Sequence, residues 1–329
     1  MTDSKSMLFQ TIRTLNVFAW ACLSILVLGS HSPSQAQESS QPTNKSGEAS
    51  DASTSRSLPD PDAKKPDTDS DDDIEPLYEN FVPPEKIIRD AFEAPPNTKS
   101  LSKRNLWIDS KNKRVIFDGY VAMTDGPLEM FACPVGTKEH ESIVGTLPKS
   151  SEVHAALLAV GAQHGTPVEF LPRFVPATGQ RIRIWVCYWD KENKFHAVDA
   201  RTWVKKAETG KQMEPDWVFA GSGFWKDPSD GREYYRADSG DMICVSNFNS
   251  AMMDVPIASS AEANDLQFVP FTDRIPPQGT PLRLVLVPIP LPSDKPAAKP
   301  QPDAKTPPTE SILPRKNADG KPLKQELGK

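Results

Sequence analysis

Two polar, proline-rich stretches limit where this chain can fold. Residues 37–82 are mostly Ser, Thr, Pro, Asp and Lys, with an acidic run at Asp69–Asp73, and residues 292–329 are rich in Pro and Lys. Segments with so little apolar surface cannot offset the entropy lost when a backbone is ordered, so we expect both to be disordered and to serve as tethers or spacers. That leaves residues 83–291, roughly two hundred residues, which is the length of one ordinary domain.

The N-terminal segment has the three parts of an export signal. Lys5 and Arg13 supply positive charge, Val17–Leu28 is apolar, and a small-residue S-Q-A sequence ends at Ala36. We therefore predict a signal peptide over residues 1–36, cleaved after Ala36, and a mature protein that is periplasmic or extracellular. The alternative is an uncleaved anchor, but the apolar run is shorter than the roughly 20 residues that span a bilayer. No later stretch is apolar enough to span one, so we expect no transmembrane segment in the mature chain.

The charge pattern bears on partners. The formal net charge is −6, and the basic residues are interspersed with acidic ones. Nucleic-acid binding requires basic residues gathered on one surface, so we expect no nucleic-acid partner. For an exported chain with polar tails, the expected kind of partner is a protein of the cell envelope.

Most of the domain has the pattern of strands. Apolar and other residues alternate with period two over Arg181–Trp189, and Leu282–Pro288 is almost continuously apolar, as in a central strand covered on both faces. Because strands do not alternate regularly with helices, we do not expect a parallel doubly wound sheet. The prediction is a single α+β, mainly β domain with a mixed or antiparallel sheet. Further strands are expected at 106–108, 114–123, 128–132, 141–144, 195–198, 217–219, 224–225, 233–236 and 242–245.

One main helix is predicted at about residues 151–161. Val153, Leu157 and Val160 fall on one helical stripe. Ser151 is the expected N-cap, and Gly161 is the expected C-cap.

The segment Gly126–Gly161 holds the residues most suited to chemistry. Cys133, His140 and His154 could supply one sulfur and two nitrogen ligands to Zn or Cu, with Glu141 or Cys244 completing the set. The same residues have the right types for a thiol nucleophile with a histidine base. None of the spacings matches a known metal motif, so the alternative is that they are ordinary buried or hydrogen-bonded residues.

Three cysteines follow the signal segment. A disulfide is plausible in an exported protein, and the expected pair is Cys133 with Cys244, one thiol being left over. Cys187 lies in the middle of a predicted strand between two tryptophans, so we interpret it as a packing residue.

A short glycine-rich stretch lies between two aromatic segments. Gly221-Ser222-Gly223 matches neither a nucleotide-binding nor a nucleophile motif, so we expect a tight turn with positive φ. The flanking aromatic residues have the pattern of core residues, with a binding cleft as the alternative. They are Trp217, Phe219, Phe224 and Trp225.

Several segments resemble the YdjY-type domain, in the longer form seen in exported planctomycete proteins. They are G-P-L-E-M-F-A-C-P, K-E-H-E-S-I, V-H-A-A-L-L-A-V-G-A, D-W-V-F-A-G-S-G-F-W and D-M-I-C-V-S-N-F, and the likeness covers Arg104 to Pro288. The family's recurring H-E-S and its helix histidine match His140, Glu141, Ser142 and His154. The resemblance implies no established molecular function. Some relatives are labelled ferredoxin-like, but this chain has no C-x-x-C-x-x-C run and only three exported cysteines, so we expect no iron–sulfur cluster.

Two hypotheses of function follow. The first is an exported, non-enzymatic binding or accessory module with polar tails. The second is a metal- or thiol-dependent redox or hydrolytic protein that uses the cluster of Cys133, His140, Glu141 and His154.

Overall fold

A computed structural model describes residues 83–262, 264–294 and 304–316. The predicted signal peptide with its cleavage after Ala36, the linker of residues 37–82 and parts of the predicted tail lie outside the described residues. None of the helices in the described part of the chain has both the length and the apolar character needed to cross a bilayer.

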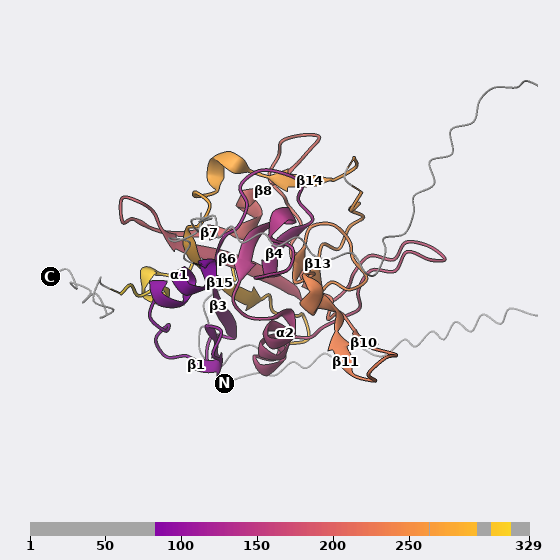
Figure 1. Cartoon of the computed structure of the whole chain (residues 1–329), viewed down its shortest axis with the longest axis horizontal. Coiled ribbons are helices and arrows are strands. Elements are labelled where there is room, and N and C mark those ends of the chain that lie inside the picture. The colour runs from indigo at the N-terminus through magenta and orange to yellow at the C-terminus, as the bar shows by residue number, and fades with distance from the viewer. Residues whose placement is uncertain (1–82, 263, 295–303, 317–329) are drawn as a thin grey trace, which may run out of the picture. The chain divides into compact units, whose positions relative to one another are not determined.

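The domain is mainly β, and its largest sheet closes on itself (Figure 1). Eight strands follow one another in the order β3, β15, β6, β9, β13, β12, β4 and β5, and β5 pairs back with β3. The pairs β4–β5 and β12–β13 are parallel and the other pairs in this ring are antiparallel, so the predicted mixed sheet is confirmed. The eight strands are β3 Arg114–Val121, β4 Met130–Pro134, β5 Ser142–Thr146, β6 Arg181–Trp189, β9 Trp217–Phe219, β12 Ile243–Cys244, β13 Met253–Asp254 and β15 Pro281–Pro288.

Shorter elements extend or cover this closed sheet. β1 and β2 continue it beyond β3, β7 pairs with β6, and two further strand pairs form small separate sheets. These strands are β1 Lys99–Ser102, β2 Leu106–Asp109, β7 Phe195–Asp199, β8 Val204–Lys206, β10 Phe224–Lys226, β11 Glu233–Tyr235 and β14 Phe268–Pro270. The helices are α1 Pro84–Ala91 and α2 Ser150–Ala159, with 3-10 turns η1 Glu139–Glu141, η2 Ala200–Trp203, η3 Arg236–Ser239, η4 Thr272–Arg274 and η5 Glu310–Ile312.

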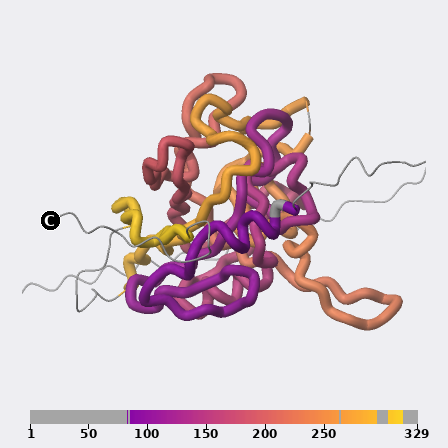
Figure 2. The backbone as a smooth tube through the Cα atoms, turned by 60° about the vertical axis from the view of Figure 1, so that its left-hand side comes forward, coloured from indigo at the N-terminus to yellow at the C-terminus, as the bar shows by residue number. Residues whose placement is uncertain are grey.

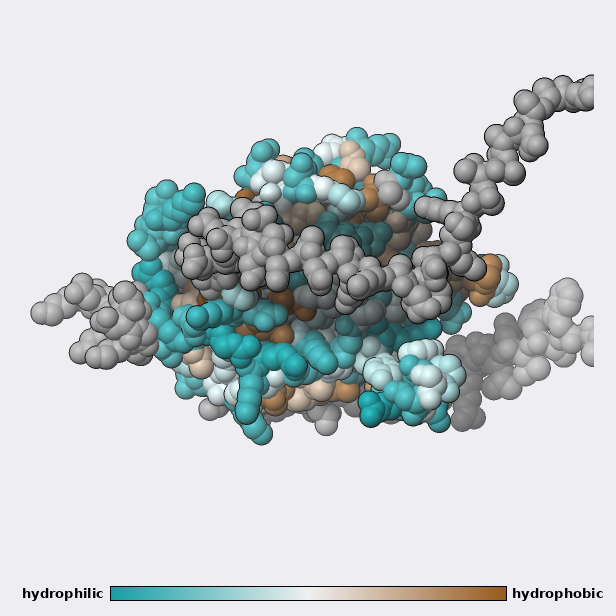
Figure 3. All heavy atoms as spheres, in the orientation of Figure 1, coloured by the Kyte–Doolittle hydropathy of each residue, from teal (hydrophilic) through white to brown (hydrophobic). Residues whose placement is uncertain are grey.

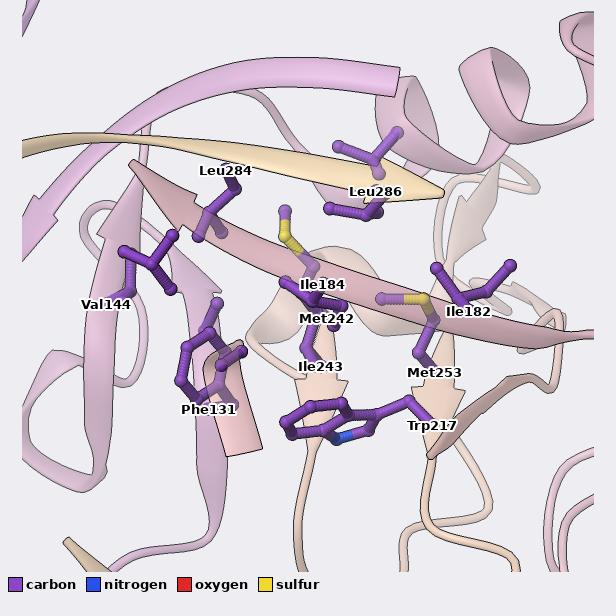
Figure 4. Close-up of a cluster of buried hydrophobic side chains, with 14 of the residues drawn as sticks. Phe131, Val144, Ile182, Ile184, Trp217, Met242, Ile243, Met253, Leu284 and Leu286 are labelled. Atoms are coloured by element: carbon purple, nitrogen blue, oxygen red, sulfur yellow. The ribbon is translucent and has the colours of Figure 1, made fainter. Parts of the chain in front are cut away.

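The side chains of β6 alternate between the two faces of the closed sheet, and this explains why each face carries its own apolar cluster. Its even-numbered residues face the main core inside the closed sheet, with Ile184 close to Met242 and Leu286 (Figure 4). Trp185 and Cys187 point to the opposite face, where a second cluster covers the outside of the sheet. β15 lies between β3 and β6 and contributes to both clusters, which confirms the prediction of a doubly covered strand.

The second cluster is covered by both ends of the described chain (Figure 2). Residues 304–316, here called the strap, lie across the outer face of β6 and β15. The Trp185 indole donates to the Ala304 carbonyl at 3.2 Å, and the Trp189 indole donates to the Leu313 carbonyl at 3.1 Å. The predicted disorder over residues 292–329 is therefore wrong for the strap, because its Ile312 and Leu313 are buried apolar side chains.

A buried arginine joins the strap, the α1 segment and the sheet. Arg283 lies in β15 and is completely buried. Its guanidinium holds the Asp118 carboxylate through two hydrogen bonds of 2.6 and 3.0 Å. It also donates to the carbonyls of Ile312 at 2.7 Å and Glu93 at 3.0 Å, so every one of these buried groups has a partner.

α2 has its predicted apolar stripe but a different N-terminus. The helix begins at Ser150, with Lys149 as the N-cap, whose backbone N–H donates to Glu152 Oε2 at 2.8 Å. Ser151 is not the cap, because its hydroxyl donates to Asp238 at 2.8 Å instead. The predicted C-cap is one residue too late: the helix ends at Ala159 with Val160 as its C-cap, and Gly161 follows with φ of 85°, a left-handed conformation that favours glycine.

Candidate functional site

Cys133 and Cys244 are both buried free thiols, so the predicted disulfide is not formed. β12 and β4 pair with Cys244 opposite Met130 and Ile243 opposite Ala132, and this register does not place the two cysteines opposite each other. Burial raises the pKa of the Cys133 thiol and, more strongly, that of Cys244. A buried thiol that keeps its proton is a poor nucleophile, and this gives the thiol hypothesis no support. Cys187 is also a buried free thiol, as its packing role requires.

His140 and Glu141 lie on η1 and face different surroundings. The His140 side chain is 77% exposed, and its Nε2 lies 3.9 Å from Glu141 Oε1. Glu141 points instead toward Lys138, a residue that the sequence analysis did not single out.

Lys138 is the centre of a cluster of three carboxylates. Its Nζ lies 3.0 Å from Asp241 Oδ1, 3.6 Å from Glu141 Oε1 and 4.0 Å from Glu129 Oε2, and it sits over the Phe248 ring. Burial lowers the pKa of Lys138, but the three carboxylates outweigh burial and raise it. Burial and the nearby Glu141 raise the pKa of Glu129. The ammonium thus balances acidic side chains from three separate segments.

His154 belongs to a second group, on the α2 face next to β9. Its Nδ1 lies 2.7 Å from the Tyr235 hydroxyl, and its ring packs edge-on against Phe219 at 4.9 Å. The Tyr235 hydroxyl donates to the Gly221 carbonyl at 3.0 Å. The His164 ring, 5.7 Å away between centroids, completes the group.

A line of polar contacts joins the two groups. Asp241 accepts a 2.5 Å hydrogen bond from the Ser250 hydroxyl, and the Ser250 carbonyl accepts a 2.6 Å hydrogen bond from Ser222. From Ser222 the chain continues back to Gly221, whose carbonyl accepts the hydrogen bond from the Tyr235 hydroxyl next to His154. Ser222 has φ of 53°, as the predicted tight turn requires. Of the predicted set, Glu141 and His154 therefore lie at the two ends of one polar line rather than around one point.

The predicted metal set does not converge. Cys133 is buried in β4, the His140 side chain is mostly exposed, and His154 contacts Tyr235 and Phe219. No group of three or more His, Cys, Asp and Glu side chains in the described ranges is arranged to hold a metal ion. The proposed combination of Cys133, His140, Glu141 and His154 is therefore not supported by the geometry.

A pocket of about 540 Å³ opens beside the Tyr235 end of the polar line. The β10–β11 hairpin, which projects from the domain in Figures 1 and 2, forms one wall. Trp225 and Tyr234 face each other across this hairpin, with ring centroids 6.0 Å apart, and both are about half exposed. The pocket is lined by Trp225, Tyr234, Tyr235, Arg236, Asp238, Ser239, Asn249 and Ser250.

The aromatic residues singled out in the sequence divide between core and surface. Trp217 and Phe219 are buried, whereas Phe224 and Trp225 are exposed. The alternation of apolar residues in the sequence does not distinguish the buried pair from the exposed pair. The reason is that the chain turns at Gly221 from the closed sheet into the projecting hairpin.

The fold and the polar line define a class of protein: a single mainly β domain closed around an apolar core, with a pocket at one edge. The chain belongs to the YdjY domain family, whose model matches residues 106–287. That match covers the whole closed sheet except the last residue of β15, and it leaves out α1 and the strap. No curated protein and no solved structure matches the chain.

Proposed function

We propose that this protein is an exported binding module whose pocket at the β10–β11 hairpin holds a saccharide. The observation that carries the proposal is the pairing of two exposed aromatic faces, Trp225 and Tyr234, with polar side chains at the same pocket. A sugar ring has an apolar face of C–H groups, which stacks on an aromatic ring, and a rim of hydroxyl groups, which need hydrogen-bond partners.

The polar lining supports this chemistry. The Arg236 guanidinium and the Asn249 amide make no hydrogen bond or ion pair with other described residues, so their donors and acceptors are available to a ligand. Asp238 is already engaged by Ser151. Tyr235 and Ser250 also line the pocket and are held by the polar line described above.

Export is part of the proposal and rests on the N-terminal sequence. A signal peptide ending at Ala36 would place the domain where envelope polysaccharides and envelope proteins are found. A mature protein whose first residue is Gln37, read by N-terminal sequencing from the producing cells, would support this; an intact N-terminus would contradict it.

The saccharide proposal is tested by calorimetric titration of the purified protein with a panel of oligosaccharides cut from envelope polysaccharides. The wild-type chain should bind at least one of them, and Trp225→Ala should weaken that binding about tenfold or more because a stacking face is lost. Trp225 is half exposed, so the change should leave the fold intact.

The matched control is Phe170→Ala. Phe170 is also about half exposed, but it lies on the loop of residues 166–178 and not at the pocket; the apolar tip of this loop is visible at the right edge of Figure 3. Affinity that is unchanged in Trp225→Ala, an equal loss in Phe170→Ala, or no binding to any of the panel would each overturn the proposal.

A further inference from the structure

Two histidines from neighbouring segments lie side by side at the surface. His154 is on α2 and His164 is in the loop that follows it, and their ring centroids are 5.7 Å apart. Both rings pack edge-on against Phe219, at 4.9 and 6.0 Å, so the same side chain positions them. His164 is exposed, and this makes the pair accessible to solvent.

Hydrogen bonding assigns the proton of each imidazole. The Tyr235 hydroxyl gives its single proton to the Gly221 carbonyl at 3.0 Å, so His154 Nδ1 must be the donor in its 2.7 Å contact with Tyr235. His164 Nδ1 lies 3.0 Å from the Gly165 carbonyl, which can only accept. Both rings therefore carry their proton on Nδ1 and a lone pair on Nε2.

Neither Nε2 has a hydrogen-bond partner within the described part of the chain. A histidine whose Nδ1–H is held by a carbonyl or hydroxyl, and whose Nε2 is left open, has the arrangement typical of metal ligands. The outer contacts to Tyr235 and Gly165 would fix the direction in which each lone pair points.

The separation of the rings suits a shared ion. In a tetrahedral zinc site each imidazole nitrogen lies about 2.0–2.1 Å from the metal, which places two ring centroids roughly 5–6 Å apart. The observed 5.7 Å falls in this range. Gly221 makes room for the arrangement: a Cβ at that position would lie 2.8 Å from His164 Nδ1.

The local electrostatics favour the ligand form of His154. Burial lowers the pKa of His154, and the neighbouring His164 lowers it further. Burial raises the pKa of Tyr235, so its hydroxyl keeps the proton that it donates to Gly221. A lowered pKa favours the uncharged imidazole, which is the form that binds a metal ion.

We propose that His154 and His164 form a binding site for a divalent transition-metal ion, Zn²⁺ or Cu²⁺, with the two Nε2 atoms as protein ligands and water in the remaining positions. This site differs from the set predicted from the sequence, since it excludes Cys133, His140 and Glu141. It goes beyond the proposed saccharide binding and does not depend on it.

The test is calorimetric titration of the full chain, prepared without a polyhistidine tag, with ZnCl₂ and separately with CuCl₂. The wild-type protein should bind one equivalent of at least one ion. His164→Ala and His154→Ala should each weaken this binding about tenfold or more, and circular dichroism should confirm that both variants are folded. His164 is exposed, so its variant should fold normally.

His140→Ala is the matched control, because it removes another exposed histidine that lies outside the pair. Its affinity for the ion should equal that of the wild type. Long-range ¹H–¹⁵N spectra of the metal-free protein should show both His154 and His164 protonated on Nδ1. The proposal is overturned by absence of binding of both ions, by an unchanged affinity in His164→Ala, by an equal loss in His140→Ala, or by an Nε2–H form of either ring.

Discussion

Asp254 is a carboxyl group that folding removes almost completely from water. Its Oδ1 accepts hydrogen bonds from Asn247 at 3.1 Å and from the backbone N–H of Val255 at 2.7 Å. Its Oδ2 is buried and has no hydrogen-bond partner among the described residues. Burial raises the pKa of Asp254 to about 7, and the nearby charge of Asp241 acts in the same direction.

This raised pKa predicts that the protein is less stable at higher pH. The folded state holds the Asp254 proton up to about pH 7, whereas the unfolded chain releases it near its ordinary pKa. The stabilising contribution is therefore complete at low pH and is lost as the pH rises through the folded pKa, by at most about 1.4 kcal/mol per unit. Urea denaturation between pH 5 and pH 8 should show this fall, and Asp254→Asn should remove most of it.

Asp265→Asn provides the control, because Asp265 is an exposed carboxylate on a loop. It should keep the pH dependence of the wild type. An Asp254→Asn protein whose stability still falls as steeply between pH 5 and pH 8 would contradict the assignment.

The ion pair of Asp118 and Arg283 lies inside the molecule. Both side chains are completely buried, and the guanidinium is also close to the ring of Trp107. Asp118→Leu would leave Arg283 charged and without its carboxylate, which typically costs about 3–5 kcal/mol.

The double variant Asp118→Leu/Arg283→Met separates the charge effect from packing. It should recover part of that loss, because it leaves no unpaired buried charge. The free energy of unfolding from chemical denaturation checks both values. A single variant that loses less than about 1 kcal/mol would show that water reaches the guanidinium.

Residue types alone identified only part of the candidate site. His154 was recognisable from its position on the helix and in the family motif. His164, Tyr235 and Lys138 were not, because each acquires its role through contacts with segments distant in the sequence. Lys138 and Asp241 do stand within motifs of the family, and their opposite charges were the available signal.

At the scale of elements, the sequence pattern was reliable where a strand is long. β6 has the predicted bounds, and β15 and β3 lie within one or two residues of theirs. In these strands the alternating or continuous apolar residues directly indicate which side chains are buried. α1, β1, β8, β13 and β14 were missed, because two to four residues carry too little periodicity and α1 is a short helix beginning at a proline.

Closure of the sheet was beyond prediction from local patterns. It depends on β3 pairing with both β15 and β5, so that Gly119 lies opposite Thr146 as well as Leu282. Gly119 is required here, because a Cβ would lie 2.6 Å from the Gly145 carbonyl oxygen. In the sequence, the glycine is the only sign of this close approach of two backbones.

For the whole molecule, the strap decides how much of the apolar surface is covered. Ala304, Ile312 and Leu313 pack on the outer cluster with Trp185 and Val287. Ending the chain at Asp303 should lower the free energy of unfolding by about 2 kcal/mol, since the apolar burial lost exceeds the ordering entropy regained. It should also shift tryptophan emission to longer wavelength, because Trp185 and Trp189 lose their cover.

A chain that ends at Lys316 is the control for this truncation. It keeps every described residue of the strap, so its stability and emission should match those of the full chain. Identical behaviour of the two truncated chains would mean that the strap contributes nothing to stability.

The contacts of Arg283 have a mechanical consequence. Phe92 pairs with Arg315, and the backbone N–H of Glu93 donates to the Pro314 carbonyl, so the first and last described segments lie together at the buried guanidinium. A load applied between the two ends of the domain would act on this junction before it reached the closed sheet. The hydrogen bonds there would break one after another. The closed sheet and its pocket would keep their shape while the junction opened.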